Sequence, residues 1–242
     1  MRILALDSSG LVASVAIVEN NQFDQQVIAE YTVNYKKTHS QTLLPMLDEV
    51  AKMIELDMST IDAIAVAGGP GSFTGLRIGS ATAKGLGLAL GKPLIHIPTL
   101  EGLAYNLCGV ENAIICPIMD ARRRQVYTGI YKFEGNKLIV LEDQMAISIE
   151  ELGEKLFEYD EKIIFLGDGV PVFRNDLIEN ILAGKTVSFA PAHMNRQSAA
   201  ALGTLAIQYF EEGKTETAAE HQPDYLRVSQ AERERKERLG ND

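Results

Sequence analysis

Residues 61–91, IDAIAVAGGPGSFTGLRIGSATAKGLGLALG, constrain the fold of this chain more than any other stretch. The apolar run at 62–67 predicts a short buried strand, and the glycines after it allow backbone conformations that are closed to other residues. Ser72 is a good N-cap for a helix that runs to about residue 90. The amide groups at such a helix start can bind phosphate, although the segment matches neither the Walker loop nor the dinucleotide-binding fingerprint. The pattern predicts a strand, a glycine loop and a helix.

Small residues recur at every fourth position of this predicted helix, at Gly75, Gly79, Ala83 and Gly87. That spacing aligns them along one side of the helix. Each interior glycine costs about 1 kcal/mol of helix stability relative to alanine, so the close approach of another backbone must offset the cost. The approaching element belongs either to this chain, which is the simpler interpretation, or to a partner subunit.

The composition predicts a folded protein, and its acidic charge predicts poor binding to nucleic acid in the absence of a partner. Apolar residues make up 46% of the 242 residues, which is enough for the core of one large domain or two lobes. The formal net charge of −10 opposes binding to a phosphate backbone, so a role with RNA requires a basic partner. Cys108 and Cys116 lack the paired spacing of a zinc site, and we expect reduced thiols. We expect a cytoplasmic protein, since neither a secretion signal nor a membrane span is recognisable.

Alternating and 3.6-residue patterns predict an α/β protein with mixed sheets. Strands are expected at 3–7, 13–18, 27–35, 62–67, 92–98, 112–119, 125–133, 137–144, 162–166 and 186–189. Helices are expected at 41–54, 73–90, 100–107, 149–159, 172–182 and 195–212. Residues 229–242 are charged with alternating sign and are expected to form a frayed helix or a disordered tail.

Several of these segments together resemble the bacterial TsaB family, also called YeaZ-like. The most specific match is GGPGSFTGLRIG at 68–79, supported by ILALDSS at 3–9, HSQTLLP at 39–45 and the Pro-x-Tyr-Leu-Arg ending at 223–227. The resemblance implies a two-lobed actin-like ATPase fold, the ASKHA or ribonuclease H-like fold. We expect an N-terminal lobe at 1–100, a C-terminal lobe at 101–212 and a C-terminal segment at 213–242.

Proteins of this family are subunits of the machinery that makes threonylcarbamoyladenosine in tRNA. The resemblance implies a non-catalytic partner of the metal-dependent subunit TsaD, joined by the ATPase TsaE, with tRNA reached only through the complex. It also implies no catalytic residues, no tightly bound cofactor, and ATP with magnesium only at the level of the complex. Two helices would pack on TsaD or, in a homodimer, on a second copy. The residues expected at this interface are His39, Leu43, Leu47, Phe73, Gly75, Leu76, Gly79, Ala83 and Gly87.

His39 begins the helix that carries two metal-binding histidines, four residues apart, in the catalytic relatives of the family. The position four residues later is Leu43 here, so the second ligand is absent. One histidine does not hold a catalytic metal, and we expect His39 to make a local hydrogen bond or an interface contact.

A weak nucleotide site is a further expectation. Actin-like ATPases place a carboxylate and hydroxyls at the tip of a hairpin, as Asp7 and Ser8 would be, and Asp120 echoes Asp7 in the second half. Gly167-Asp168-Gly169 resembles the adenosine-side loop of the same group. The simpler explanation of Asp7 is a turn in which side chains cap their own backbone.

The remaining charged motif and two other function classes stay open. Arg122, Arg123 and Arg124 form either a solvated turn or a contact with phosphate, RNA or an acidic partner. A nucleotide-dependent transferase or small-molecule kinase would use the two hairpin aspartates around magnesium. A peptidase, suggested by the glycoprotease label of some relatives, is disfavoured because neither a second metal histidine nor a nucleophile–base pair is visible.

Overall fold

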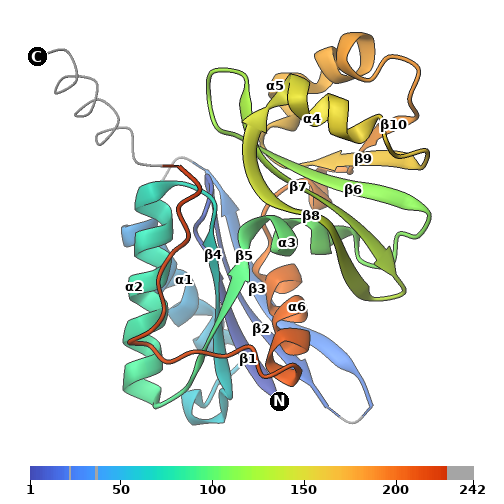
Figure 1. Cartoon of the computed structure of the whole chain (residues 1–242). Helices are drawn as coiled ribbons and strands as arrows, with labels where there is room; N and C mark the ends of the chain where they lie inside the picture. Colours follow the sequence, from blue (N-terminus) through green and yellow to red (C-terminus); the bar gives the residue numbers. More distant parts are fainter. Residues whose placement is uncertain (22, 36–37, 228–242) are drawn as a thin grey trace, which may run out of the picture.

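The computed structural model describes residues 1–21, 23–35 and 38–227, and they form two five-stranded mixed sheets with helices on both sides of each (Figure 1). The first sheet has the order β3-β2-β1-β4-β5, and the second has the order β10-β9-β6-β7-β8. The strands of the first sheet are β1 (Arg2–Asp7), β2 (Val12–Asn20), β3 (Gln25–Asn34), β4 (Ala63–Gly69) and β5 (Leu94–Pro98). Those of the second are β6 (Ala113–Asp120), β7 (Gln125–Glu134), β8 (Lys137–Ser148), β9 (Lys162–Leu166) and β10 (Val187–Phe189).

Each sheet joins an antiparallel meander to a parallel pair. In the first, β1 pairs antiparallel with β2 and parallel with β4, and in the second, β6 pairs antiparallel with β7 and parallel with β9. The apolar runs predicted as buried strands are buried: Ile3, Leu4 and Ile64 are fully covered. The repeated topology places the end of β1 and the end of β6 as two equivalent hairpin tips, as the sequence predicted.

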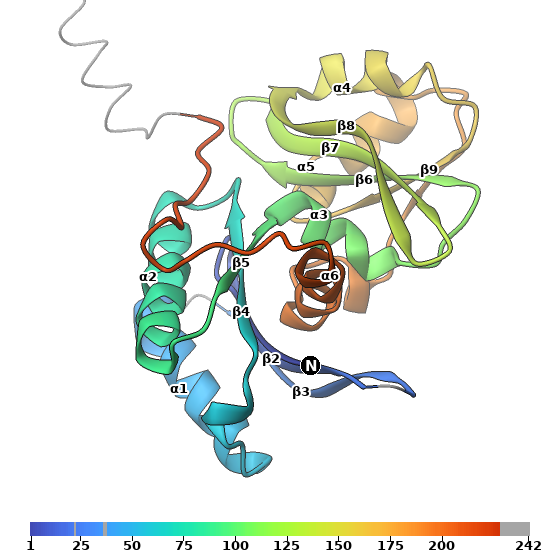
Figure 2. The ribbon, with the colours of Figure 1, turned by 60° about the horizontal axis from the view of Figure 1, so that its bottom comes forward.

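The helices and sheets alternate in layers (Figures 1 and 2). The helices are α1 (His39–Met53), α2 (Phe73–Leu90), α3 (Thr99–Ala104), α4 (Ile149–Leu156), α5 (Val170–Asp176) and α6 (Ala199–Glu211). The α1 and α2 helices cover the outer face of the first sheet, α3 and α6 lie between the sheets, and α4 and α5 cover the outer face of the second. Short 3-10 turns occur at Met58–Thr60, Tyr105–Leu107 and Ala192–Met194, and one π-helical turn at Leu177–Ile181.

The layer between the sheets changes the division expected from sequence. Residues 199–211 were predicted to belong to the C-terminal lobe, but Leu202, Leu205 and Ala206 of α6 share a core with Ile3 of β1 and Ile115 of β6. The helix also starts at residue 199 rather than 195, because Ser198 caps it by accepting a 3.2 Å hydrogen bond from the amide of Ala201.

Two other boundaries differ from the prediction. Thr99 is the first residue of α3 and not its side-chain cap, because its hydroxyl accepts a 3.1 Å hydrogen bond from the Gly69 amide at the end of β4. The helix expected at 149–159 ends at Leu156. Among the described residues, no helix combines the length and the hydropathy that crossing a membrane requires. The tail predicted at 229–242 lies outside the described residues.

After α6 the chain returns to the first sheet. Leu94 and Glu216 exchange two backbone hydrogen bonds of 2.9 Å, and the segment then follows α2 toward the hairpin tips (Figure 1). This C-terminal segment, residues 213–227, thus packs on the N-terminal lobe and ends beside the gap between the two lobes.

Candidate functional site

A cleft of about 540 Å³ lies between the two hairpin tips and is bordered by the C-terminal segment. The first half of the chain contributes the turn after β1, the start of α1 and the glycine loop before α2. The second half contributes the end of β6 and the loop after β9. The polar and charged residues that line the cleft are Ser9, His39, Ser72, Asp120, Arg122, Asp168, Asp224 and Arg227.

At the first tip, Asp7 is turned away from the cleft. Its Oδ1 accepts hydrogen bonds of 2.8 Å from the Ser9 amide and 2.7 Å from the Ser9 hydroxyl, and only 3% of the residue is exposed. Burial raises the pKa of Asp7 to about 6, and the two bonds from Ser9 oppose that rise. Ser8 is also buried, and its hydroxyl donates to the Gly75 carbonyl at 2.9 Å. The Asp7 side chain is therefore bonded within its own turn, and the Ser8 side chain links the turn to α2.

At the second tip, two of the predicted residues do meet in the cleft. The amide of Asp120 donates a 3.0 Å hydrogen bond to Oδ1 of Asp168, and burial raises the pKa of Asp168. Gly167 has a φ of +110°, and a Cβ on either Gly167 or Gly169 would press against the carbonyl of Ile118. The Gly-Asp-Gly loop is thus packed closely against β6. The carboxylates of Asp120 and Asp168 are the acidic groups that the second half of the chain contributes to the cleft.

The three consecutive arginines point to different partners. Arg122 pairs with Asp120 at 3.1 Å and lines the cleft. Arg124 donates to Glu150 and to Asp176 at 2.6 Å, which ties the hairpin to the α4–α5 side of the lobe. Arg123 is exposed. All three have positive φ angles, between 54° and 68°. The arginines therefore do not form one continuous basic patch.

His39 and the small-residue stripe are both engaged with the chain itself. Nε2 of His39 lies 2.7 Å from the Gly10 carbonyl, which fits the hydrogen bond that was one of the two roles expected for it. A Cβ on Gly75 would overlap the Ser8 carbonyl, one on Gly79 would lie 2.7 Å from the Ser8 hydroxyl, and one on Gly87 would lie 3.0 Å from Leu94. The groups that approach the stripe are therefore Ser8, directly after β1, and the side chain of Leu94 on β5.

The residues expected at a partner interface differ in exposure. Most of them face the protein's own core. The buried ones are Leu43, Leu47, Gly75, Leu76, Gly79, Ala83 and Gly87. Phe73 and His39 remain partly exposed.

The contacts of the C-terminal segment escaped the sequence analysis. The rings of Phe73 and Tyr225 are 4.9 Å apart, and Nε of Arg77 donates to the Tyr225 hydroxyl at 3.2 Å. Arg227 donates a 2.8 Å hydrogen bond to the carbonyl of Ala121 at the second tip. The Tyr-Leu-Arg motif could be recognised in the sequence, but nothing local predicted that it joins the start of α2 to the second tip.

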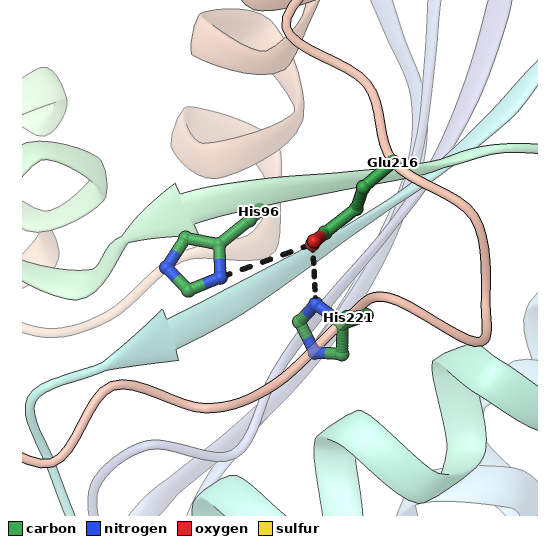
Figure 3. Close-up of side chains that lie close together, drawn as sticks. All are labelled: His96, Glu216 and His221. Atoms are coloured by element: carbon green, nitrogen blue, oxygen red, sulfur yellow. Dashed lines mark hydrogen bonds and ion pairs between the residues drawn. The ribbon is translucent and has the colours of Figure 1, made fainter.

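A second cluster joins the same segment to β5 (Figure 3). Oε1 of Glu216 is 2.6 Å from Nδ1 of His221 and 4.0 Å from Nδ1 of His96. Burial lowers the pKa of His221, which favours the neutral imidazole. His96 and His221 are 125 positions apart in the chain (221 − 96), so no sequence spacing pointed to the cluster.

Comparisons with known proteins agree with this architecture. Residues 26–235 match the family model for TsaD, tRNA N6-adenosine threonylcarbamoyltransferase. The tRNA threonylcarbamoyladenosine biosynthesis protein TsaB of Bacillus subtilis is 34% identical over 236 residues, covering 96% of this chain and 96% of that protein. The Escherichia coli TsaB protein is 29% identical over 229 residues, covering 94% of this chain and 95% of that protein.

Solved structures confirm the fold. YeaZ from Pseudomonas aeruginosa superposes with a TM-score of 0.76 at 24% identity, over 93% of this chain and 99% of that chain. A glucokinase from an Antarctic psychrotroph superposes with a TM-score of 0.50 at 10% identity, over 86% of this chain and 99% of that chain. The two-lobed fold shared with sugar kinases is the one that the sequence predicted.

Proposed function

The chain belongs to the TsaB branch of the TsaD family, and we propose that it is a non-catalytic subunit that pairs with a TsaD-like protein in the synthesis of tRNA threonylcarbamoyladenosine. The hydrogen bonds at the first hairpin tip support the absence of a catalytic role. The Asp7 carboxylate accepts hydrogen bonds from Ser9, and the Ser8 hydroxyl donates to the Gly75 carbonyl on α2. Nε2 of His39, at the start of α1, faces the carbonyl of Gly10. A catalytic group must instead be within hydrogen-bond reach of a substrate.

The core packing of α1 supports the same proposal. Leu43 occupies the position four residues after His39, and it is 1% exposed in the core between α1 and the first sheet. A metal site on this helix would need a second ligand at that position, and an apolar side chain supplies none. The helix thus has a structural role where the catalytic relatives have a metal site.

The arrangement does not favour a peptidase. Ser9 lines the cleft, but its hydroxyl donates to Asp7, and the only ring nitrogen of His39 with a hydrogen-bond partner is directed to Gly10. A serine nucleophile requires a base that accepts its proton, with a third group orienting that base. Ser9, His39 and Asp7 are all present here, but the serine is bonded to the aspartate and not to the histidine. The histidine therefore cannot accept the serine proton.

We place the partner contact on the outer side of α1 and α2. Leu44 is 53% exposed and Leu88 is 73% exposed. Between them α2 presents Ala81 and Gly85, and a Cβ on Gly85 would have no atom within 4 Å. Small residues between exposed leucines allow a second helix pair to pack closely. The same surface would pair two copies of the chain in the absence of the partner.

We propose that ATP with magnesium binds at the level of the complex. Asp120 and Asp168 are the cleft carboxylates suited to magnesium, but Asp120 is paired with Arg122 and Asp7 is withdrawn. The TsaE-like ATPase and the tRNA join through the assembly, since a chain of net charge −10 is a poor binder of RNA by itself. Tight magnesium-dependent ATP binding by the isolated chain would favour the kinase alternative.

Reconstitution tests the proposal. The chain is mixed with the TsaD-like and TsaE-like proteins of its organism, unmodified tRNA, threonylcarbamoyl adenylate as the group donor and ATP, and the modified nucleoside is quantified. We expect modification to require the chain but to survive Ser9→Ala and His39→Gln within about twofold. Loss of modification on either substitution, with the complex intact, would contradict a non-catalytic role.

A further inference from the structure

The cluster of His96, Glu216 and His221 brings three metal-ligand side chains from two distant parts of the chain to one point. His96 lies on β5, and the other two lie on the C-terminal segment (Figure 3). One ligand atom from each lies within 4.8 Å of the other two. His221 is 1% exposed, and the side chains of His96 and Glu216 are 22% and 26% exposed. The cluster is therefore sheltered but reachable from solvent.

We propose that these three side chains bind a divalent transition-metal ion of the zinc class, which fastens the C-terminal segment to β5. Two imidazole nitrogens and one carboxylate oxygen are a common ligand set for Zn²⁺, with a water in the fourth position. This site is separate from the cleft, and the proposal does not depend on the function proposed above.

The distances suit such an ion after small side-chain movements. Ligands about 2.1 Å from a tetrahedral zinc lie roughly 3.4 Å from one another. The Glu216 oxygen is 2.6 Å from one Nδ1 and 4.0 Å from the other, so the observed separations bracket that value. Both Nδ1 atoms face the carboxylate (Figure 3). All three ligand atoms lie within 4.8 Å of one another, so side-chain rotations could bring them to one metal.

A second carboxylate, that of Asp224, lies beside the ring nitrogen of His96 that would not bind the metal. Metal-binding histidines commonly have a carboxylate at that nitrogen. Nε2 of His96 lies 3.2 Å from Oδ2 of Asp224, outside the angle of a hydrogen bond. A carboxylate at that nitrogen favours the proton there, which leaves the Nδ1 lone pair free for a metal. The nearby cation, Lys84, is bound to the backbone carbonyl of His221 at 2.9 Å. The Nε2 atoms of both histidines are buried without a hydrogen bond, so the cluster is not satisfied by its own contacts.

A metal here would fix the path of the segment to the cleft. Between the cluster and the cleft, the amide of Asp224 donates a 2.7 Å hydrogen bond to the Gly68 carbonyl, and Tyr225 and Arg227 follow directly. Ligands from β5 and from the segment would be joined by one ion, and opening the segment would then require breaking metal bonds as well as hydrogen bonds.

Cobalt and zinc titrations of the full chain test the proposal. Co²⁺ reports tetrahedral nitrogen–oxygen coordination through its visible absorption, and calorimetry gives the stoichiometry and affinity for Zn²⁺. We expect one ion per chain, and at least a tenfold loss of affinity in His96→Ala and in Glu216→Gln. The matched controls are His193→Ala, an exposed histidine on the other lobe, and Cys108→Ser, which removes a partly exposed thiol. Both should bind as the unaltered chain does.

A second measurement needs no substitution, so it tests the proposal even if the variants fold poorly. Hydrogen exchange of the unaltered chain is followed with and without Zn²⁺, and we expect slower exchange at the amides of Glu216 and Asp224 with the metal. Absence of a stoichiometric ion in the unaltered chain would overturn the proposal and leave the cluster as a polar latch. Equal binding by His96→Ala, or loss of binding in His193→Ala alone, would overturn it as well.

Discussion

The hydroxyl of Ser8 donates a 2.9 Å hydrogen bond to the carbonyl of Gly75, and the carbonyl of Ser8 occupies the space that a Cβ on Gly75 would need. This double contact fastens the tip of the first hairpin to the first turn of α2. It explains why the third residue of α2 has no side chain.

Two glycines of α2 should respond oppositely to the same substitution. Gly75→Ala would force apart the Ser8 backbone and α2, and we expect a loss of about 1–3 kcal/mol in the free energy of unfolding. Gly85→Ala adds a Cβ that meets nothing within 4 Å, and we expect a gain of up to about 1 kcal/mol from helix propensity. Urea unfolding followed by circular dichroism measures both. Equal effects of the two would contradict the assignment of the stripe to the chain's own packing.

Asp7 should make stability depend on pH. The folded pKa of about 6 lies above the unfolded value of about 3.8, so the folded state binds the proton more tightly. The stabilising effect is full below pH 3.8 and is lost as the pH rises through 6. Asp7→Asn should therefore raise the free energy of unfolding at pH 7 by up to about 3 kcal/mol, with the gain vanishing toward pH 4. Denaturant unfolding at several pH values tests this, and a gain independent of pH would argue against it.

Tyr225 should hold the end of the C-terminal segment. Tyr225→Ala removes the contact with Phe73 and the hydrogen bond from Arg77, which together are worth about 1–2 kcal/mol. We expect roughly tenfold faster hydrogen exchange at the Asp224 amide, with little change in the melting temperature. Tyr35→Ala, on a tyrosine that is 69% exposed, is the matched control. Unchanged exchange in Tyr225→Ala would show that other contacts hold the segment.

The sequence was most informative where a local pattern decides the structure. Ser72 caps α2 by accepting a hydrogen bond from the Gly75 amide, and the strand that ends at Asp7 has an unbroken apolar run. The fold class followed from such segments and from the family resemblance. The face of α2 that packs inward could be read from its glycines, and within the chain Ser8 and Leu94 contact Gly75, Gly79 and Gly87.

What the sequence could not predict depends on contacts between distant residues. Tyr225 meets Phe73 across about 150 positions, and His96 meets His221 only because residues 213–227 return to β5. The withdrawal of Asp7 from the cleft follows from its bonds to Ser9, which compete with any phosphate ligand. Neither the spacing nor the composition of the sequence predicts which of the two partners Asp7 binds.

We propose that the outer side of α1 and α2 joins this chain to a TsaD-like partner, and light scattering after size-exclusion chromatography measures that association. The unaltered chain should form a 1:1 complex, and Leu88→Asp should abolish it while leaving the melting temperature unchanged. The matched control is Val172→Asp, which places the same charge at a 57% exposed position on α5 and should leave the complex intact. A chain that stays apart from the TsaD-like protein, or a complex formed equally well by Leu88→Asp, would contradict the account.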